Sequence, residues 1–360
     1  MKKFLSNVLL IAICAIFGFG IGYFGFLNFL TEITTLEFIM ILVFLVLWFI
    51  LGIIIHELGH LVCGWMSGYT FGFFKLGSLA WFYEDDKIKF KCSKNFAVGQ
   101  CLMMPPDEEA DFRFLLYNLG GVIFNFLTGF AILPIWYLFP NSYLLRSFSM
   151  MGFFVSFLLG ITNLIPMRSQ GNDGANILEA LKSTDGKRAL YLLLYIHAQL
   201  MKGRRCKEID EEIICNYGKL DESNYVVGNV LMYEIEYLLE LGRAEEALII
   251  TEINTNNAPA IHKHLFNLYK LRIYTSFLPD FEKARRIYEN KEFKSFLKLK
   301  LPSITAILIS YEFFVNNNPE KANELLAQAK LNIESIPNKG ERLSIIAHLC
   351  EIEEKMKNPI

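Results

Sequence analysis

The stretch LGIIIHELGHLVCGW, residues 51–65, decides how the rest of the chain is interpreted. It places His56 and His60 four positions apart, with Glu57 directly after the first, inside an apolar run that begins near Phe38. On a helix, residues four apart lie on one face, so both imidazoles can bind one Zn²⁺ while Glu57 lies beside the attacking water. Ionisable side chains inside a membrane span are costly and mark function. The pattern therefore favours a zinc hydrolase over a pair of packing histidines.

The composition divides the chain into two halves. Hydrophobic residues make up 53% of the 360 residues and are concentrated before about residue 167, which indicates a membrane half and a soluble half. We expect a membrane-embedded domain at 1–182 and a cytoplasmic helical domain at 183–360. The net charge of −2, without a basic tract, argues against a nucleic-acid partner. The seven cysteines are scattered and lack CxxC spacing, so we expect reduced thiols.

Four apolar stretches predict four membrane spans, at about 4–31, 38–65, 114–139 and 147–166. The first is far longer than the core of a signal peptide, so we interpret it as a span. Lys and Arg are abundant before the first span, between the second and third, and after the fourth. This distribution predicts a multi-pass protein of a bacterial-type cytoplasmic membrane with both termini cytoplasmic. Between the second and third spans, two strands and an acidic turn predict a small sheet at the membrane surface.

Two polar residues of the later spans are candidates for the same site. Asn125 follows Gly120 and Gly121 in the third span, where it either bonds a neighbouring helix or holds a substrate carbonyl near the metal. The two glycines permit the close helix approach that both interpretations require. Asp173 follows the break that ends the fourth span and could supply the carboxylate that two histidines lack as a zinc site. The residues by themselves favour the alternative, in which Asp173 caps the helix that starts near Ala175.

With HELGH at 56–60, the glycines before Asn125 and the NxxP…DG element at 163–174, the first half resembles the site-2 protease family of intramembrane zinc metalloproteases. The resemblance covers about residues 36–182. It implies a three-helix membrane core and a protease that cleaves a membrane-embedded or membrane-associated peptide or single-span protein near the cytoplasmic face. It also assigns the site: zinc ligands His56, His60 and Asp173, general base Glu57, and substrate-binding residue Asn125.

The chain departs from the family pattern in two places. Val122 replaces the proline of the GPxxN motif, although the glycine-to-Asn125 spacing is kept. The segment between Asn163 and Asp173 is longer than the compact NxxPxPxLDG form of the family. The segment 68–113 is also too short to hold a PDZ-like insertion, so we expect substrate selection to lie elsewhere in the chain.

The second half carries three similar helical stretches. Aligning Ala247, Ala284 and Ala322 gives periods of 37 and 38 residues, each after a turn signal. Such periods are typical of stacked helical hairpins, and the stretches resemble degenerate tetratricopeptide repeats, which implies a concave surface for a protein partner. The histidines of this half show no ligand spacing and are expected to be surface or packing residues: His197, His262, His264 and His348.

These features predict a mainly α-helical fold: about four membrane helices with a small membrane-surface β element, followed by a soluble helical repeat domain. The favoured function is an intramembrane zinc metalloendopeptidase. The alternative is a membrane-anchored helical-repeat scaffold with a structural zinc site. A structural site has no need of Glu57, so the intact HELGH motif favours the enzyme.

Overall fold

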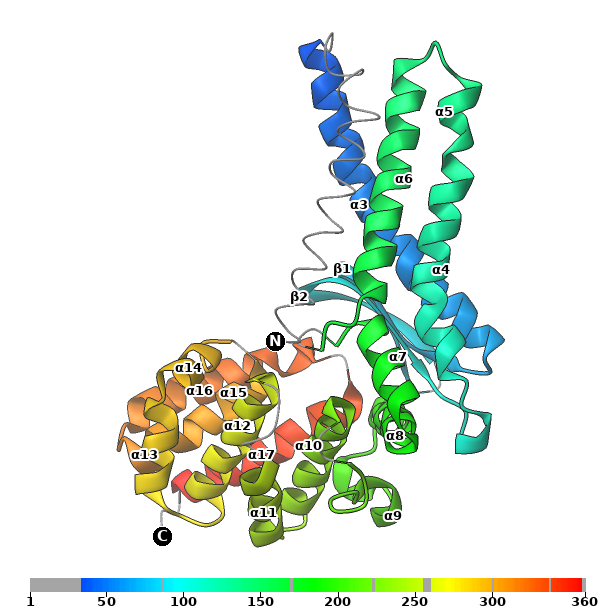
Figure 1. Ribbon diagram of the computed structural model, residues 1–360. Coiled ribbons are helices and arrows are strands. Elements are labelled where there is room, and N and C mark those ends of the chain that lie inside the picture. The colour runs from blue at the N-terminus through cyan, green and yellow to red at the C-terminus, as the bar shows by residue number, and fades with distance from the viewer. Residues whose placement is uncertain are drawn as a thin grey trace. The chain divides into compact units, whose positions relative to one another are not determined.

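The computed structural model describes residues 34–85, 87–168, 171–221, 224–254, 260–299, 301–336 and 338–357. The described chain is mainly helical, with one small antiparallel sheet, and divides into two compact units (Figure 1). The membrane unit comprises residues 34–66, 115–167 and 171–175. The helical unit comprises the segment 67–114, Arg168 and the described residues from 176 onward. The domain boundary at 182 and 183 stays a prediction.

Within the described residues, three helices are long and apolar enough to cross a membrane. They are α3 (Thr35–Met66), α4 (Phe114–Ile132) with its continuation α5 (Pro134–Leu138), and α6 (Tyr143–Leu164). Pro134 has no backbone N–H to donate, which explains the interruption between α4 and α5. The last three predicted spans are thus confirmed as long apolar helices, whereas the span predicted at 4–31 lies outside the described residues.

Helices α3 and α6 pack together along their length, as Figure 1 shows. The indole Nε1 of Trp48 on α3 donates a hydrogen bond of 2.8 Å to the carbonyl oxygen of Phe148 on α6. Gly152 makes room for this ring, because a Cβ there would lie 2.5 Å from it. The outer side of α3 is exposed and apolar, which suits lipid rather than water. Its exposed side chains include Leu36, Phe38, Ile39, Val43, Val46 and Ile50.

Helices α3 and α4 cross at two glycines. A Cβ on Gly59 would lie 2.3 Å from the carbonyl oxygen of Gly120, and a Cβ on Gly120 would lie 2.4 Å from that of Gly59. The close approach predicted for Gly120 is therefore confirmed. Cys63 is buried beside the same crossing, with its Cβ 2.9 Å from the position of a Gly120 Cβ. Its small side chain lets the two backbones meet.

The segment after α3 forms a long β-hairpin of two antiparallel strands, β1 (Thr70–Glu84) and β2 (Lys87–Met104). The predicted small sheet is therefore confirmed, while its place at a membrane surface stays a prediction. One face of the hairpin is buried in the helical unit, where Phe73 and Phe82 pack with Met201 of α8.

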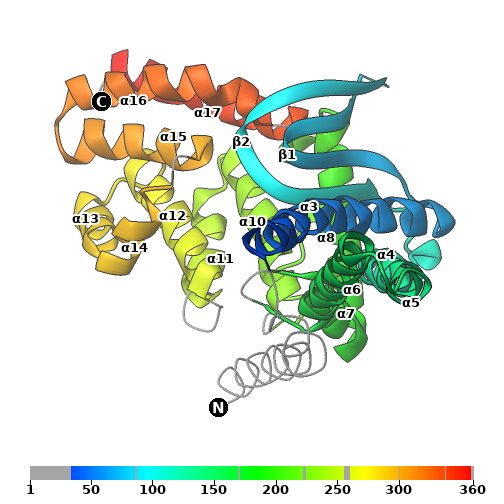
Figure 2. The same ribbon diagram turned by 90° about the horizontal axis from the view of Figure 1, so that it is seen from above.

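The remaining helices of the helical unit follow one another in a compact array (Figure 2). Helix α7 (Asp173–Lys182) leads into it. The others are α8 (Thr184–Met201), α9 (Glu211–Ile214), α10 (Tyr225–Glu240), α11 (Ala244–Asn254), α12 (Ala260–Ser276), α13 (Phe281–Glu289), α14 (Lys291–Phe296), α15 (Pro302–Ser310), α16 (Pro319–Asn332) and α17 (Lys339–Lys357). Side-chain caps begin several of them by accepting a free backbone N–H: Ser183, Asn224, Asp280 and Asn318.

Helices of the array pack in sequential pairs, α10 with α11, α12 with α13 and α15 with α16. The aligned residues Ala247, Ala284 and Ala322 lie in the second helix of each pair, and all three are 0% exposed. A larger side chain would not fit at these positions without moving a helix.

The first turn of α17 is tied to the tip of the hairpin. Arg342 donates a hydrogen bond of 2.5 Å to Glu84, and both side chains are largely buried. Lys339 makes an exposed ion pair of 2.5 Å with Asp85. These contacts explain why the hairpin belongs to the helical unit. The cysteines within the described residues are free thiols, as predicted: Cys63, Cys92, Cys101, Cys206, Cys215 and Cys350.

Candidate metal centre

Three residues from two distant parts of the sequence meet in the membrane unit. His56 and His60 lie on one face of α3, and Asp173 is the first residue of α7. The Asp173 Oδ2 atom lies 3.1 Å from His56 Nε2 and 3.3 Å from His60 Nε2, and the two Nε2 atoms are 3.2 Å apart. Among the described residues, these three form the group of His, Cys, Asp and Glu side chains able to hold one metal ion.

The backbone of α4 sets the tautomer of His60. Its Nδ1 lies 2.8 Å from the carbonyl oxygen of Tyr117, which can only accept, so Nδ1 carries the proton and donates it. When the ring is neutral, its Nε2 atom presents a lone pair to the cluster. This lone pair faces a carboxylate oxygen and a second imidazole nitrogen. A proton or a metal ion between these electron-rich atoms would remove their repulsion.

The spacing of the three atoms fits Zn²⁺. Zinc binds imidazole nitrogen at about 2.0–2.1 Å and carboxylate oxygen at about 2.0–2.2 Å, so ligand atoms of a tetrahedral site lie roughly 3.3 Å apart. The observed separations are 3.1, 3.2 and 3.3 Å. Cys63 is not in the group that the structure places together within the described residues. Three ligands leave a fourth position for water or substrate, as catalytic zinc sites do.

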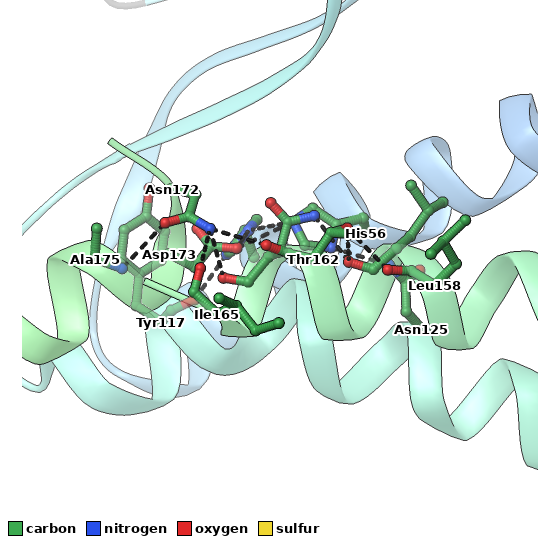
Figure 3. A network of polar contacts seen from close by, with 12 residues as sticks. His56, Tyr117, Asn125, Leu158, Thr162, Ile165, Asn172, Asp173 and Ala175 are labelled. Atoms are coloured by element: carbon green, nitrogen blue, oxygen red, sulfur yellow. Dashed lines mark hydrogen bonds and ion pairs between the residues drawn. The ribbon is translucent and has the colours of Figure 1, made fainter. Parts of the chain in front are cut away.

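The side chain of Asn172 holds Asp173 in place, as Figure 3 shows. Its Nδ2 donates to carbonyl oxygens at the end of α6, at 3.0 Å to Thr162 and 2.8 Å to Ile165. Its Oδ1 accepts from the backbone N–H of Ala175 at 3.2 Å. One amide thus joins the last turn of a membrane helix to the first turn of α7.

These bonds distinguish the two interpretations of Asp173. Helix α7 begins at Asp173, and Asn172 makes the capping contact with Ala175. The Asp173 carboxylate is left to face the histidines. Gly174 is required beside it, because a Cβ there would lie 2.1 Å from the carbonyl oxygen of Leu164. Asn172 was not among the predicted site residues. An asparagine directly before a helix commonly caps it, and this signal could have identified Asn172.

Burial by itself would raise the pKa of the Asp173 carboxyl group. The neighbouring imidazoles of His60 and His56 outweigh this effect and lower the pKa well below its usual value. Asp173 is therefore a carboxylate over the physiological pH range, which is the form that binds a metal ion.

Asn125 is fully buried beside His56. Its Nδ2 atom lies 3.1 Å from His56 Nδ1, while its Oδ1 atom has no hydrogen-bond partner among the described residues. Of the two interpretations of Asn125, the bond to a neighbouring helix is observed, and contact with a substrate stays a prediction. Gly121 makes this arrangement possible, because a Cβ there would lie 2.4 Å from the imidazole of His56.

Glu57 is buried on α3 between the two histidines in sequence. A buried glutamate in a membrane helix is costly and marks a functional position. Between His56 and His60, Glu57 is the one residue with an ionisable side chain.

Comparisons with known proteins add nothing to this description. No family model, no curated protein and no solved structure matches the chain.

Proposed function

We propose that the chain is an intramembrane zinc metalloendopeptidase. In this proposal His56, His60 and Asp173 bind Zn²⁺, and Glu57 is the general base. The observation that carries it is the set of three ligand atoms separated by 3.1–3.3 Å. Three protein ligands, fewer than the four of a structural zinc site, and a glutamate next to the first histidine in the sequence support catalytic rather than structural zinc.

A zinc ion at this position would polarise a peptide carbonyl and lower the pKa of a bound water. Glu57 would accept the proton of the attacking water and transfer it to the nitrogen of the leaving amine. The Tyr117 carbonyl holds the His60 ring in orientation, and Asn172 holds Asp173. These residues keep the ligands in place before a substrate enters.

Asn125 orients His56 in this mechanism. With its amide turned so that Oδ1 faces the ring, the oxygen accepts from Nδ1–H and gains the partner that it otherwise lacks. Nε2 of His56 then has its lone pair free for the metal, as Nε2 of His60 does. A direct contact between Asn125 and the substrate is compatible with this role once the ring is in place.

The substrate of the proposed enzyme is a membrane-embedded or membrane-associated peptide, or a single-span protein, cleaved near the cytoplasmic face of a bacterial-type membrane. The exposed apolar surface of α3 and the three candidate spans support a place within the lipid bilayer. A peptide must unwind there to expose its amide, because a helical backbone is already hydrogen-bonded. Both chain termini are cytoplasmic in this topology.

We further infer that the helical unit is built from degenerate tetratricopeptide-like repeats that bind a protein partner. The three paired helices and the buried residues Ala247, Ala284 and Ala322 support this inference. Deleting α10 to α16 would abolish recruitment of such a partner, measured by cross-linking in membranes.

The test of the protease is the variant Glu57→Gln, with cleavage of tagged single-span reporter proteins measured in membranes and zinc measured on purified protein. We expect at least a hundredfold loss of cleavage with zinc content unchanged, because general base catalysis typically contributes about 10²–10⁴-fold. Glu37→Gln, near the start of the same helix, is the matched control and should cleave normally.

Two outcomes contradict the enzyme. Normal cleavage by Glu57→Gln would remove Glu57 from the mechanism. A wild-type chain that binds zinc and cleaves no reporter would support the alternative, a membrane-anchored scaffold with a structural zinc site.

A further inference from the structure

A cavity of about 430 Å³ lies inside the helical unit. Its wall on α17 is formed by Glu341, Ser344, Ile345 and His348, which recur at positions i, i+3, i+4 and i+7 and thus share one face. The lining residues of α10 and α12 follow the same spacing. The cavity is therefore bounded by inner faces of several helices, and its volume lies within the range of small-molecule sites.

Polar groups in this wall lack partners. Among the described residues, no hydrogen bond is made by Arg272 Nε, Ser344 Oγ, His348 Nε2 or His197 Nδ1. Arg272, Ser344 and His348 are 5%, 7% and 6% exposed. Each unpaired buried group costs free energy, and native proteins rarely leave several around one cavity. Their convergence indicates a polar ligand.

The charges of the wall restrict the kind of ligand. Arg272 Nη1 donates to both carboxylate oxygens of Glu236 at 2.7 and 2.9 Å, so this pair is balanced. Burial lowers the pKa of His197 and His348, which keeps both rings neutral near pH 7. Glu341 lines the cavity at an exposed position, where its carboxylate is able to pair with a positive group of a ligand.

The cavity thus offers a carboxyl group, on Glu341, and a guanidinium N–H without a partner among the described residues, on Arg272. A zwitterionic ligand brings no net charge into the cavity, and its ammonium and carboxylate groups match these two side chains. The apolar part of the wall, which includes Leu268 and Ile307, suits an aliphatic side chain.

We propose that this cavity binds a free amino acid or a dipeptide with an aliphatic side chain. The ammonium group pairs with Glu341, and the carboxylate accepts hydrogen bonds from Arg272 Nε and Ser344. Helix α17, which packs against α8 and α15, forms one wall of the site. The site is independent of the zinc chemistry, since every lining residue belongs to the helical unit.

The experiment is isothermal titration of the purified full-length protein in detergent with leucine and with leucyl-leucine. N-acetyl-leucine, which lacks the ammonium group, and leucinamide, which lacks the carboxylate, are the matched probes. We expect one saturable site for leucine or its dipeptide and at least tenfold weaker binding of both blocked compounds. Equal binding of a blocked compound would overturn the two-charge assignment, and no binding of either zwitterion at millimolar concentration would overturn the site.

The variant Glu341→Gln keeps the size of the side chain and removes its charge. We expect it to weaken binding of the zwitterion about tenfold while leaving N-acetyl-leucine unchanged. Glu354→Gln, at an exposed position on the same helix, is the control and should bind as wild type. Circular dichroism of both variants would show that the helices are intact. Unchanged affinity in Glu341→Gln would contradict the proposed ammonium contact.

Discussion

His56 and His60 of the membrane unit differ from His197 and His348, two of the four histidines of the helical unit, in how their ring nitrogens are satisfied. In the membrane unit, His56 and His60 have neighbours at both ring nitrogens, and their Nε2 atoms converge on one point. In the helical unit, His197 contacts Tyr233 at 2.6 Å through Nε2, while its Nδ1 has no partner among the described residues. His348 likewise has an unpartnered Nε2.

Residue type alone therefore does not define a site. The first pair is four residues apart on one helix and is held by an amide and a carbonyl, which is how metal ligands are oriented. The second pair comes from α8 and α17 and lines a cavity with other incompletely bonded groups. One arrangement suits a cation, and the other suits a small ligand with several hydrogen-bonding groups.

The largest effect is expected for Asp173→Ala. Removing the third ligand should lower the zinc content of purified protein from about one ion per chain to a small fraction, because two histidines alone bind weakly. His348→Phe alters the other histidine cluster and should leave the zinc content unchanged. Zinc is measured by atomic absorption. Equal zinc in wild type and Asp173→Ala would show that the cluster in the membrane unit is not the metal site.

The second largest effect is a loss of stability of the helical unit at low pH. Burial lowers the pKa of His197 to about 4, so the unfolded chain, with an ordinary value near 6.5, binds the proton more tightly. Stability is therefore fully present above about pH 6.5 and is lost as the pH falls toward 4. Because His197 lines a cavity that water can enter, we expect a loss of roughly 2 kcal/mol.

Urea unfolding followed by circular dichroism between pH 7.5 and 4 would measure this loss. His197→Gln keeps a hydrogen-bonding group near Tyr233 and removes the titration, so its stability should fall less over the same range. The same pH dependence in wild type and His197→Gln would show that His197 is not the group responsible.

A smaller effect is expected for Gly121→Ala. The added methyl group would lie 2.4–2.6 Å from the His56 ring and must displace it. Displacing an oriented ligand should weaken zinc binding about tenfold to a hundredfold, measured by competition with a chelator. Gly129→Ala on the same helix is the control, because its methyl group would lie close to the ring of Phe157, at 2.9 Å, and at ordinary contact distance from the Phe153 carbonyl oxygen, away from His56. Equal zinc affinity in both variants would mean that His56 does not bind the metal.

The smallest effect is expected for Cys63→Ala. Cys63 packs at the crossing of α3 and α4 and lies outside the group of metal-ligating side chains. The zinc content should therefore equal that of wild type within error. A loss of zinc in this variant would add Cys63 to the ligands and would change the site from an open catalytic one to a closed structural one.

The local features of the site could be predicted from the sequence alone. The four-residue spacing places His56 and His60 on one face of a helix whatever the rest of the chain does, because an α-helix repeats every 3.6 residues. Apolar runs of sufficient length predicted α3, α4 and α6, and the hairpin followed from two strands flanking an acidic turn. The glycine before Asn125 was predicted to permit a close helix crossing, and Gly120 does so.

The contacts between distant segments could not be predicted from the sequence and are seen only in the tertiary structure. Asp173 and His56 are 117 residues apart, and the sequence alone favoured a helix cap over a ligand as the role of the aspartate. In the structure Asn172 bonds the end of α6 and the backbone of Ala175, and the Asp173 carboxylate contacts the histidines. The histidines of the helical unit were predicted to be surface or packing residues, and nothing in their spacing indicated a cavity, because its walls come from separate helices. Periodicity specifies which side of a helix is buried, but not which helix it meets.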